Sequence, residues 1–412
     1  MTQKLALEYQ LFKVVQWFYT KLDAVVGFLT GYSIIWGPLV SKMDDAIFTN
    51  IIWRAPTSPA CFWRSAFVSN MLVKYQRMGK SREILVNDMI SLWTVTRTHA
   101  VFVLCSENIH NTKKHPFTFT AQYQCAKQLI FISHETLHRL ASEVHPKSTL
   151  IVIHNTARCG STLICQMFNQ LPRTRVYSEP WSFVVSQGLH LSNTASAKLT
   201  ESMVKMYLKS DDIRRVVIKM CQLSVTTVPI IKSLFPGAQL IFNTRHPVKS
   251  IESFERTLRF VPNSLTAEKA DFWFCHLPFL QGMTETERQY FLKRRQLGNI
   301  YSLTLGYALS LRVFLENKKL YCYSVLYEDL VECPRDQARK ILTCVGIEEG
   351  FVDKALKAFK NDSQNGAFRT VPVADRFNNV DWDTSDRLQE EVESPARHTM
   401  SLEQLRHLTN VE

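Results

Sequence analysis

The sequence lacks the features that mark several common classes of protein. Its 412 residues include only 13 glycines and 15 prolines, which excludes a collagen-like or low-complexity chain. No dense block of five or more Lys or Arg residues is present, so a basic nucleic-acid-binding tail is not expected. With 46% hydrophobic and 21% charged residues, the chain has instead the composition of a globular protein with a sizeable core.

The cysteines form neither a zinc-binding pattern nor a compact disulfide framework. No CxxC pair occurs, and several thiols lie in apolar runs, where a reduced Cys behaves as a small hydrophobic residue. We therefore expect no metal and favour a reducing, cytoplasmic compartment. The ten cysteines are Cys61, Cys105, Cys125, Cys159, Cys165, Cys221, Cys275, Cys322, Cys333 and Cys344.

The charge balance indicates an anionic partner. Forty-nine Lys and Arg residues against 37 Asp and Glu residues give a net charge of +12. Such an excess attracts anions without identifying them. Nucleic acid, an acidic membrane surface and a phosphorylated small molecule all remain open at this point, although the missing basic tail counts against nucleic acid.

The N-terminal segment, residues 1–50, is apolar but interrupted by charges. The uncharged run from Ala24 to Val40 is short of the ~20 apolar residues that a membrane span needs, and it contains glycine, proline and hydroxyl side chains. Two interpretations stay open. The segment is either a membrane anchor with a cytoplasmic N-terminus, as in a type II Golgi membrane protein, or a set of buried or membrane-resting amphipathic helices.

The rest of the chain divides by its pattern. Residues 51–147 read as a mixed, partly helical N-terminal extension, with helical patterning near Phe67–Arg77. Residues 148–370 alternate strands with helices, which predicts an α/β fold: a parallel sheet flanked by helices in three layers. Residues 371–412 form a polar C-terminal tail. The predicted strands are Thr149–His154, Arg215–Met220, Gln239–Asn243 and Leu320–Val325; the predicted helices include Ser161–Gln170, Val225–Leu234, Val248–Thr257 and Arg335–Cys344.

A short polar turn between the first of these strands and its helix is the strongest candidate site. The turn reads Arg158-Cys159-Gly160-Ser161-Thr162. Amide groups at a helix start, a glycine that allows close approach, two hydroxyls and a guanidinium suit a phosphate group. The alternative is an ordinary strand-to-helix turn capped by Ser161. The GxxxxGK[ST] motif of nucleoside triphosphatases is absent, which counts against a kinase.

These residues resemble the sulfotransferases that use 3′-phosphoadenosine 5′-phosphosulfate (PAPS). The family's 5′-phosphosulfate loop is matched by Arg158–Thr162, except that Cys159 stands where serine is usual. Its 3′-phosphate site, an Arg at a strand end with a Ser eight residues later, is matched by Arg245 and Ser253. A third element, the YEDL segment at Tyr327–Leu330, follows in family order, and we read it as mostly structural. The resemblance covers about residues 148–370 and implies a P-loop-like nucleotide-binding core.

The resemblance implies roles for individual residues. Arg158, with Gly160, Ser161, Thr162 and the backbone of Cys159, would bind the 5′-phosphosulfate. Arg158 would stabilise the leaving phosphate. Arg245 and Ser253 would bind the 3′-phosphate, and Arg369, in a late polar loop, would close over it. No metal is implied.

The sequence offers two positions for a general base. Cytosolic members of the family use the His of a K-x-H motif, but this chain has Lys219-Met220-Cys221, and a buried thiol is a poor base. Other branches use a Glu shortly after the phosphate loop, and Glu179 is our candidate. A loop carboxylate paired with Arg173 or Arg175 is the alternative. Lys219 would stabilise sulfate oxygens, or would be a strand residue without a role in the chemistry.

Other residues carry weaker signals. His154 at a strand end and His246 after Arg245 could contact ligand, although such polar residues often satisfy backbone groups. The aromatic segment 271–276 could line an acceptor cleft, although core packing is the commoner role.

Two functions are consistent with the sequence. The first is an enzyme that transfers the sulfuryl group of PAPS to a hydroxyl acceptor, such as a carbohydrate, a lipid or a small molecule. The second is a protein that binds PAPS or its product, 3′-phosphoadenosine 5′-phosphate (PAP), and has lost catalysis. Cys159 and the missing histidine at Cys221 motivate this alternative.

Overall fold

The structure is a computed structural model of the 412-residue chain. It describes residues 2–30, 32–33, 37–38, 45–56, 68–107, 109, 116–189, 191–259, 299–360 and 402–410. The chain divides into two compact units, one formed by Met1–Ser148 with Pro180–Ile213 and the other by Thr149–Glu179 with Arg214–Glu412. The chain therefore leaves the second unit after Glu179 and returns to it at Arg214.

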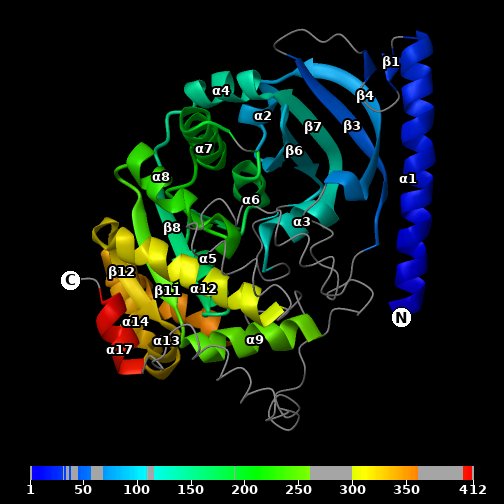
Figure 1. Ribbon diagram of the computed structural model, residues 1–412. Helices are drawn as coiled ribbons and strands as arrows, with labels where there is room; N and C mark the ends of the chain where they lie inside the picture. The colour runs from blue at the N-terminus through cyan, green and yellow to red at the C-terminus, as the bar shows by residue number, and fades with distance from the viewer. Residues whose placement is uncertain are drawn as a thin grey trace. The chain divides into compact units, whose positions relative to one another are not determined.

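The first unit is built on an antiparallel sheet (Figure 1). Its strand order is β4-β3-β7-β6-β5, and each neighbouring pair is antiparallel. A two-stranded ribbon, β1 with β2, precedes this sheet in the chain. The strands are β1 (Tyr32–Ser33), β2 (Gly37–Pro38), β3 (Asp45–Arg54), β4 (Met71–Lys80), β5 (Ile90–Val95), β6 (His99–Cys105) and β7 (Ala126–Ser133).

The helices of the first unit include one long N-terminal helix. The hydroxyl of Ser133 accepts a hydrogen bond from the Thr136 amide at 3.0 Å, which caps α4. No described helix combines the length and hydropathy needed to cross a bilayer. The helices are α1 (Thr2–Thr30), α2 (Glu83–Val86), α3 (Thr118–Cys125), α4 (His134–Glu143), α6 (Trp181–Gln187) and α7 (Asn193–Tyr207).

The helical patterning predicted near Phe67–Arg77 is wrong. Only Val68–Asn70 forms a short 3₁₀ turn, and β4 begins at Met71. Met71, Leu72 and Val73 are all buried, and β4 pairs with β3 along its length. Pairing across the sheet therefore overrides a local pattern that also fits a helix.

The second unit contains a five-stranded sheet in which every described pair is parallel. The order β12-β11-β8-β10-β9 puts β8 in the centre. The residues Leu150–Ile153 of β8 are all buried, as expected for an interior strand of a parallel sheet. The strands are β8 (Thr149–Asn155), β9 (Thr174–Ser178), β10 (Arg215–Lys219), β11 (Gln239–Thr244) and β12 (Tyr321–Leu326).

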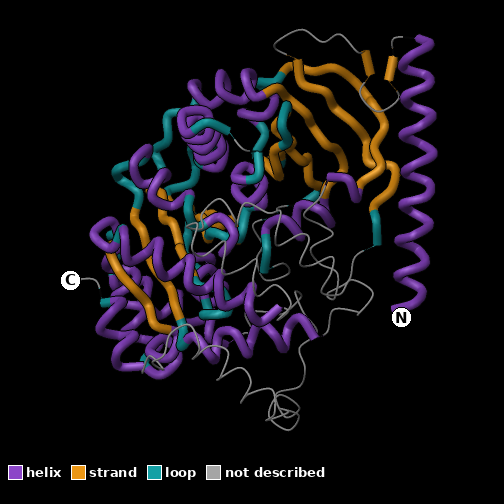
Figure 2. The backbone as a smooth tube through the Cα atoms, viewed as in Figure 1, coloured by secondary structure: helices purple, strands orange, loops and turns teal. Residues whose placement is uncertain are grey.

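Helices cover both faces of this sheet, as the purple and orange tubes of Figure 2 show. On one face, Ile151 and Ile153 join a core cluster that includes Phe168. On the other, Phe242 stacks on Phe314, with ring centroids 3.9 Å apart. The predicted α/β fold with a parallel sheet between helices is confirmed. The helices are α5 (Ser161–Asn169), α8 (Thr227–Leu234), α9 (Pro247–Arg259), α12 (Asn299–Glu316), α13 (Tyr327–Glu332), α14 (Pro334–Cys344), α15 (Val352–Ala355) and α17 (Leu402–Thr409).

Candidate functional site

The carboxyl ends of all five parallel strands carry the polar residues of the candidate site. Arg158 follows β8, Glu179 follows β9, Lys219 ends β10, Arg245 follows β11 and Glu328 follows β12. The carboxyl ends of parallel strands lie at one edge of a sheet. The strand order also reverses at β8: β9 and β10 lie on one side of it, and β11 and β12 lie on the other. Ligands of open α/β sheets bind at such a point.

The turn after β8 has an unusual backbone conformation. Ala157 and Arg158 have φ angles of 62° and 48°, in the left-handed region that non-glycine residues rarely adopt. Two hydrogen bonds fix it: the Ala157 amide donates to Oδ1 of Asn155 at 3.0 Å, and Oγ of Ser250 donates to the Ala157 carbonyl at 2.8 Å. The surrounding structure thus stabilises a strained turn, which is common at functional sites.

The start of α5 is open to an anion. Gly160 is the N-cap residue, with a φ of 80°, and it has no side chain to cap the helix. Its carbonyl accepts from the Leu163 amide at 2.9 Å, so the amides of Ser161 and Thr162, at the very start of α5, are the ones that receive no oxygen from this residue. A Cβ added to Gly160 would lie 2.4 Å from Cδ2 of Tyr327. Ser161 and Thr162 follow in the first turn of the helix, and both are buried. This combination of glycine, helix start and hydroxyl groups fits a phosphate or sulfate group.

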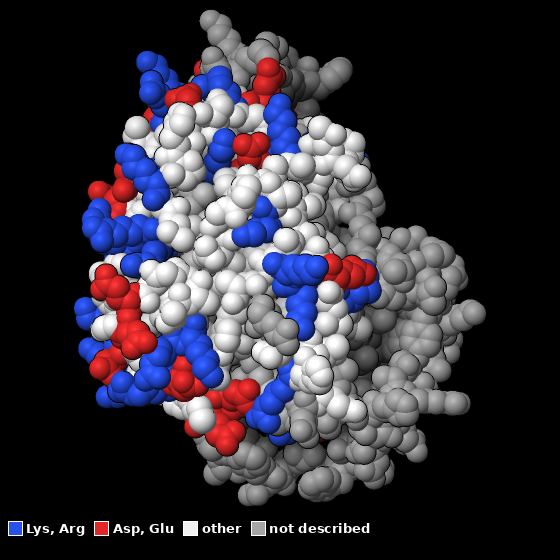
Figure 3. All heavy atoms as spheres, turned by 90° about the vertical axis from the view of Figure 1, so that its left-hand side faces the viewer, with Lys and Arg blue, Asp and Glu red and all other residues white. Residues whose placement is uncertain are grey.

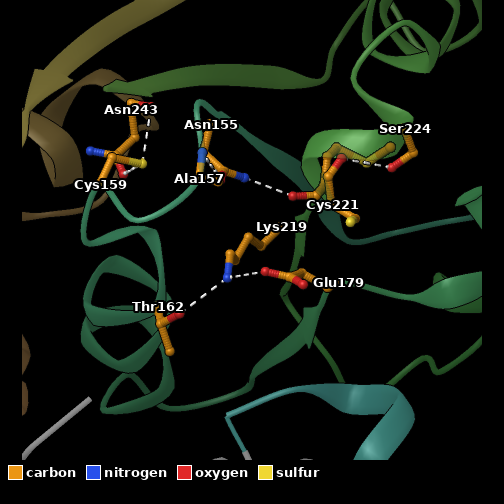
Figure 4. A network of polar contacts seen from close by, with 10 residues as sticks. Asn155, Ala157, Cys159, Thr162, Glu179, Lys219, Cys221, Ser224 and Asn243 are labelled. Atoms are coloured by element: carbon orange, nitrogen blue, oxygen red, sulfur yellow. Dashed lines mark hydrogen bonds and ion pairs between the residues drawn. The ribbon is translucent and has the colours of Figure 1, made fainter. Parts of the chain in front are cut away.

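Lys219 connects this helix start to Glu179 (Figure 4). Its Nζ lies 3.1 Å from Oγ1 of Thr162 and 2.6 Å from Oε1 of Glu179. The Lys219 side chain is 2% exposed, whereas that of Glu179 is 21% exposed. Burial, the largest single influence, acts to lower the pKa of Lys219. The charge and hydrogen bond of Glu179, together with the nearby thiols of Cys165 and Cys159, more than offset it, so that the pKa of Lys219 is raised. The site therefore holds a buried cation next to an accessible carboxylate.

Two arginines and a serine meet at the neighbouring strand ends. Nε of Arg158 donates to Oγ of Ser253 at 3.2 Å, and an Nη of Arg245 donates to the carbonyl oxygen of Arg158 at 3.4 Å. Burial, together with the nearby Arg245 guanidinium, lowers the pKa of Arg158. Two cations held close together in a buried setting favour an anionic ligand between or beside them.

Tyr327 and Glu328 belong to the same site, although the sequence suggested a mostly structural segment. The Tyr327 ring lies 4.6 Å from Cζ of Arg245 as well as against Gly160. Oε1 of Glu328 lies 3.9 Å from Nε of Arg245 and accepts from the His246 amide at 3.4 Å. The signal that could have revealed them is their position directly after β12, as Arg245 stands directly after β11.

Cys159 and Cys221 lie in surroundings that do not favour a reactive thiol. The Cys159 thiol is buried and donates to Oδ1 of Asn243 at 2.9 Å, so its side chain anchors the turn to β11. Its backbone remains at the turn. Burial raises the pKa of Cys221 to about 12, which keeps its thiol protonated at neutral pH.

His154 lies in the core. Its Nδ1 is 2.6 Å from Oη of Tyr321, and burial lowers its pKa to about 3. His246 lies at the strand edge through the contact of its amide with Glu328. Arg369 and the aromatic segment 271–276 lie outside the described residues.

The described residues contain no candidate metal cluster, and the face drawn in Figure 3 carries charges of both signs. Within the described ranges, no three His, Cys, Asp or Glu side chains gather as metal ligands would. On the face shown in Figure 3, basic and acidic side chains are interspersed. Ion pairs such as Lys340 with Asp336, at 2.8 Å, accompany this mixed distribution.

The fold and the site together define an α/β protein with a strained turn and an uncapped helix start at the carboxyl edge of a parallel sheet. Residues 151–352, just under half of the chain, match the model of the sulfotransferase family. This match supports a sulfotransferase-family domain over these residues and sulfuryl transfer as its general activity. A search of curated proteins finds no match.

Several solved sulfotransferase structures are similar to this chain. One from Alicyclobacillus acidocaldarius has 16% identity and a TM-score of 0.37, covering 64% of this chain and 96% of that one. Sulfotransferase STF9 from Mycobacterium avium has 13% identity and a TM-score of 0.37, covering 63% and 79%. Mouse sulfotransferase SULT7A1, complexed with PAP, has 16% identity and a TM-score of 0.36, covering 68% and 94%.

Proposed function

We propose that this protein transfers the sulfuryl group of PAPS to a hydroxyl-bearing acceptor. One observation carries the proposal: the Lys219 ammonium contacts Thr162, at the start of α5, and Glu179 at the same time. A group that binds a phosphosulfate and a group that can accept a proton are thus joined by one buried cation. Sulfuryl transfer requires such groups side by side.

The 5′-phosphosulfate would bind at the turn after β8. Arg158, the start of α5 and the hydroxyls of Ser161 and Thr162 supply positive charge and hydrogen-bond donors, and the Cys159 backbone completes the turn. When the bond between sulfur and the phosphate oxygen breaks, that oxygen gains negative charge. Fixed donors stabilise such developing charge without having to reorient. Arg158 and Lys219 are the two cations assigned to this task.

The 3′-phosphate would bind at Arg245 and Ser253. The side chain of Ser253 lies 3.2 Å from Nε of Arg158, and Nε of Arg245 is buried with no hydrogen-bond partner among the described residues. Its ion pair with Glu328, at 3.9 Å, is too long for a hydrogen bond. A buried donor without a hydrogen bond is costly, and a dianionic phosphate would supply one. This fit supports a nucleotide with phosphate groups at both its 5′ and 3′ ends.

Glu179 is the proposed general base. It would accept the proton of the acceptor hydroxyl while the acceptor oxygen bonds to sulfur and the bond from sulfur to the PAP phosphate oxygen breaks. The products are a sulfate ester, PAP and one proton, so the step is balanced. Lys219 holds the Glu179 carboxylate at 2.6 Å, which orients it toward the helix start.

A binding protein without catalysis is the second candidate. The observation that favours it is Cys221, whose pKa is raised to about 12 by burial. This residue occupies the position where related cytosolic enzymes have a basic histidine. If Glu179 does not act as the base, no other described group in this position can accept a proton at neutral pH.

The experiment compares binding with transfer. PAP binding is measured by calorimetry, and transfer of ³⁵S from labelled PAPS is measured to a panel of carbohydrate, lipid and small-molecule acceptors, to extracts of the source organism and to water. We expect the wild-type chain to do both. Glu179→Gln should keep PAP affinity within about threefold and reduce transfer about 10²- to 10⁴-fold, whereas Arg158→Ala should weaken both.

Each outcome identifies a different error in the proposal. Wild-type binding of PAP without transfer to any acceptor, water included, would favour the binding protein. Full transfer by Glu179→Gln would remove Glu179 as the base. Absence of PAP binding by the wild-type chain would contradict the assignment of the donor.

A further inference from the structure

The long N-terminal helix α1 has an apolar face that points away from its own unit. We call this the outer face, and it contains one exposed charged side chain, Lys21, among the described residues of the helix. Trp17 and Phe18 are 56% and 62% exposed. Aromatic and aliphatic groups this exposed are unusual on a surface helix. The apolar members of the outer face are Leu7, Leu11, Val14, Val15, Trp17, Phe18, Leu22 and Val25.

The opposite side of α1 is the more polar one, and it faces the protein. Nζ of Lys13 and Nε2 of Gln16 donate to the Ser69 carbonyl at 3.2 Å and 2.6 Å. Oη of Tyr9 donates to Oδ1 of Asn70 at 3.4 Å. Phe12 is the buried apolar anchor among these polar contacts. The helix is thus inverted relative to an ordinary surface helix, whose apolar side faces the core.

Phe12 fixes this orientation. Its ring meets Trp53 edge to face, with ring centroids 5.3 Å apart, and it packs with Ala55 and Leu72 at the ends of β3 and β4. Figure 1 shows α1 alongside these strands. Rotating the helix to bury the outer face would break this cluster and the hydrogen bonds to Ser69. The outer face is therefore held outward by specific contacts.

The width of the outer face indicates what covers it. At 100° per residue the outer face spans an arc of about 160°: the aliphatic side chains and Phe18 form a continuous band of about 100°, and exposed Gln10 and Lys21 lie between this band and Trp17. A two-stranded coiled coil needs only a narrow seam of a and d positions, so pairing with one helix of a second copy would leave much of this face in water. A lipid surface covers a wide arc, as amphipathic helices in the plane of a bilayer show.

The one exposed charge among the described residues of this face, Lys21, lies between Trp17 and the aliphatic band and agrees with a lipid surface. Nζ of Lys21 lies 5.9 Å from the centroid of the Trp17 ring, and a tryptophan with a lysine is typical of the boundary between lipid tails and headgroups. The chain carries a net charge of +12, which attracts it to an anionic headgroup layer. We propose that α1 lies in the plane of an anionic phospholipid membrane, with the outer face in the lipid.

Flotation of the full chain with lipid vesicles tests this proposal. We expect the chain to float with vesicles that contain phosphatidylserine, to float less with pure phosphatidylcholine, and to bind less as salt is added. The variant Val14→Glu with Phe18→Glu should bind at least tenfold more weakly. Its matched control, Val86→Glu with Val331→Glu, adds the same two charges at exposed apolar positions outside α1 and should float as the wild type does.

Two further measurements separate lipid from a second copy. Trp17 should shift its fluorescence to shorter wavelength on adding vesicles, and Trp17→Phe should abolish that shift. Light scattering without lipid should show no dimer formed through the outer face. Such a dimer would be present in the wild type and in the control variant and absent from the Val14→Glu/Phe18→Glu variant. Failure of the wild type to float, equal flotation of both double variants, or such a dimer would overturn the proposal. Thermal unfolding of each variant checks that it is folded.

Discussion

Nζ of Lys219 lies 2.6 Å from Oε1 of Glu179, although the two residues are 40 positions apart in the chain. The cause is the pairing of β9 with β10, which puts Lys219 opposite Ser178, directly before Glu179. The Glu179 amide also donates to the Lys219 carbonyl at 2.8 Å, so the backbone fixes the pair as well. A charge pair held at the carboxyl edge of a parallel sheet is well placed to act on a ligand there.

Replacement of Lys219 by methionine tests the importance of this cation. Methionine fills a similar volume but leaves Thr162 and Glu179 without their shared donor. We expect transfer of ³⁵S from PAPS to fall about 10²- to 10³-fold, the usual effect of removing one fixed donor to developing charge. We also expect unfolding in urea to become easier by about 2 kcal/mol, since a carboxylate loses its buried partner but keeps some contact with water.

The control for this change is Lys205→Met, which removes a lysine from a surface ion pair with Glu201. It should alter the free energy of unfolding by less than about 1 kcal/mol and leave transfer unchanged. Wild-type transfer by Lys219→Met would limit Lys219 to a structural role.

Arg158→Met separates ligand binding from folding. The substitution removes one of two neighbouring guanidiniums, so the repulsion with Arg245 that helps to lower the pKa of Arg158 disappears. We expect the unfolding free energy of the ligand-free chain to stay within about 1 kcal/mol of the wild type. PAP affinity should fall by about 2 kcal/mol, roughly 30-fold, because a charge-assisted hydrogen bond is lost.

Calorimetry with PAP and urea unfolding measure the two quantities. Arg335→Met, which removes a cation from an exposed pair with Asp353, should change neither. If Arg158→Met unfolds easily and still binds PAP tightly, Arg158 is a structural residue and its assignment to the phosphate fails.

The sequence predicted the central strands of the second unit and the helices that follow them, because each strand is a continuous apolar run with a helical pattern directly after it. It missed β9, whose five residues, Thr174–Ser178, include Thr174 and Arg175 and resemble a loop. Arg175 is nonetheless buried. In the first unit, the pairing of β3 with β4 decides the structure of Met71–Lys80, and no local pattern contains that information.

Some contacts of the candidate site could be predicted from the sequence and others could not. Arg158, Arg245 and Ser253 could be found from motif spacing, and the structure brings them together. The partner of Glu179 could not be found this way, since the sequence suggested Arg173 or Arg175, whereas the structure pairs Glu179 with Lys219. Which strands become neighbours determines such contacts, and strand order is not encoded in any short segment.

His154 provides a pH-dependent test of the core. Its pKa in the folded chain is lowered to about 3 by burial, against ~6.5 when unfolded. Below pH 6.5 the unfolded chain therefore binds more protons than the folded chain, so the stability from neutral His154 is present above pH 6.5 and is lost as the pH falls. From pH 8 to pH 5 this loss should reach about 2 kcal/mol.

Urea unfolding of the wild type and of His154→Gln, measured across this range, isolates the effect of this one group. The glutamine cannot be protonated, so the difference in unfolding free energy between the two chains should change by about 2 kcal/mol between pH 8 and pH 5. Parallel pH profiles would mean that His154 takes up a proton in the folded chain.

Gly160→Ala is the last test, because it combines a strained backbone with a steric clash. Gly160 has a φ of 80°, and a Cβ there would lie 2.4 Å from Cδ2 of Tyr327. Gly346 has a φ of 72° and nothing within 4 Å of an added Cβ, so Gly346→Ala measures the backbone cost alone, about 1 kcal/mol. We expect Gly160→Ala to cost more than this in urea unfolding and to lower PAP affinity, because Tyr327 must move. Adding Tyr327→Ala should recover part of the lost stability. The destabilisation that remains should equal the backbone cost measured at Gly346 plus the cost of removing the Tyr327 ring. Equal effects of the two glycine substitutions, with PAP affinity unchanged in both, would show that the contact between Gly160 and Tyr327 does not shape the phosphate turn.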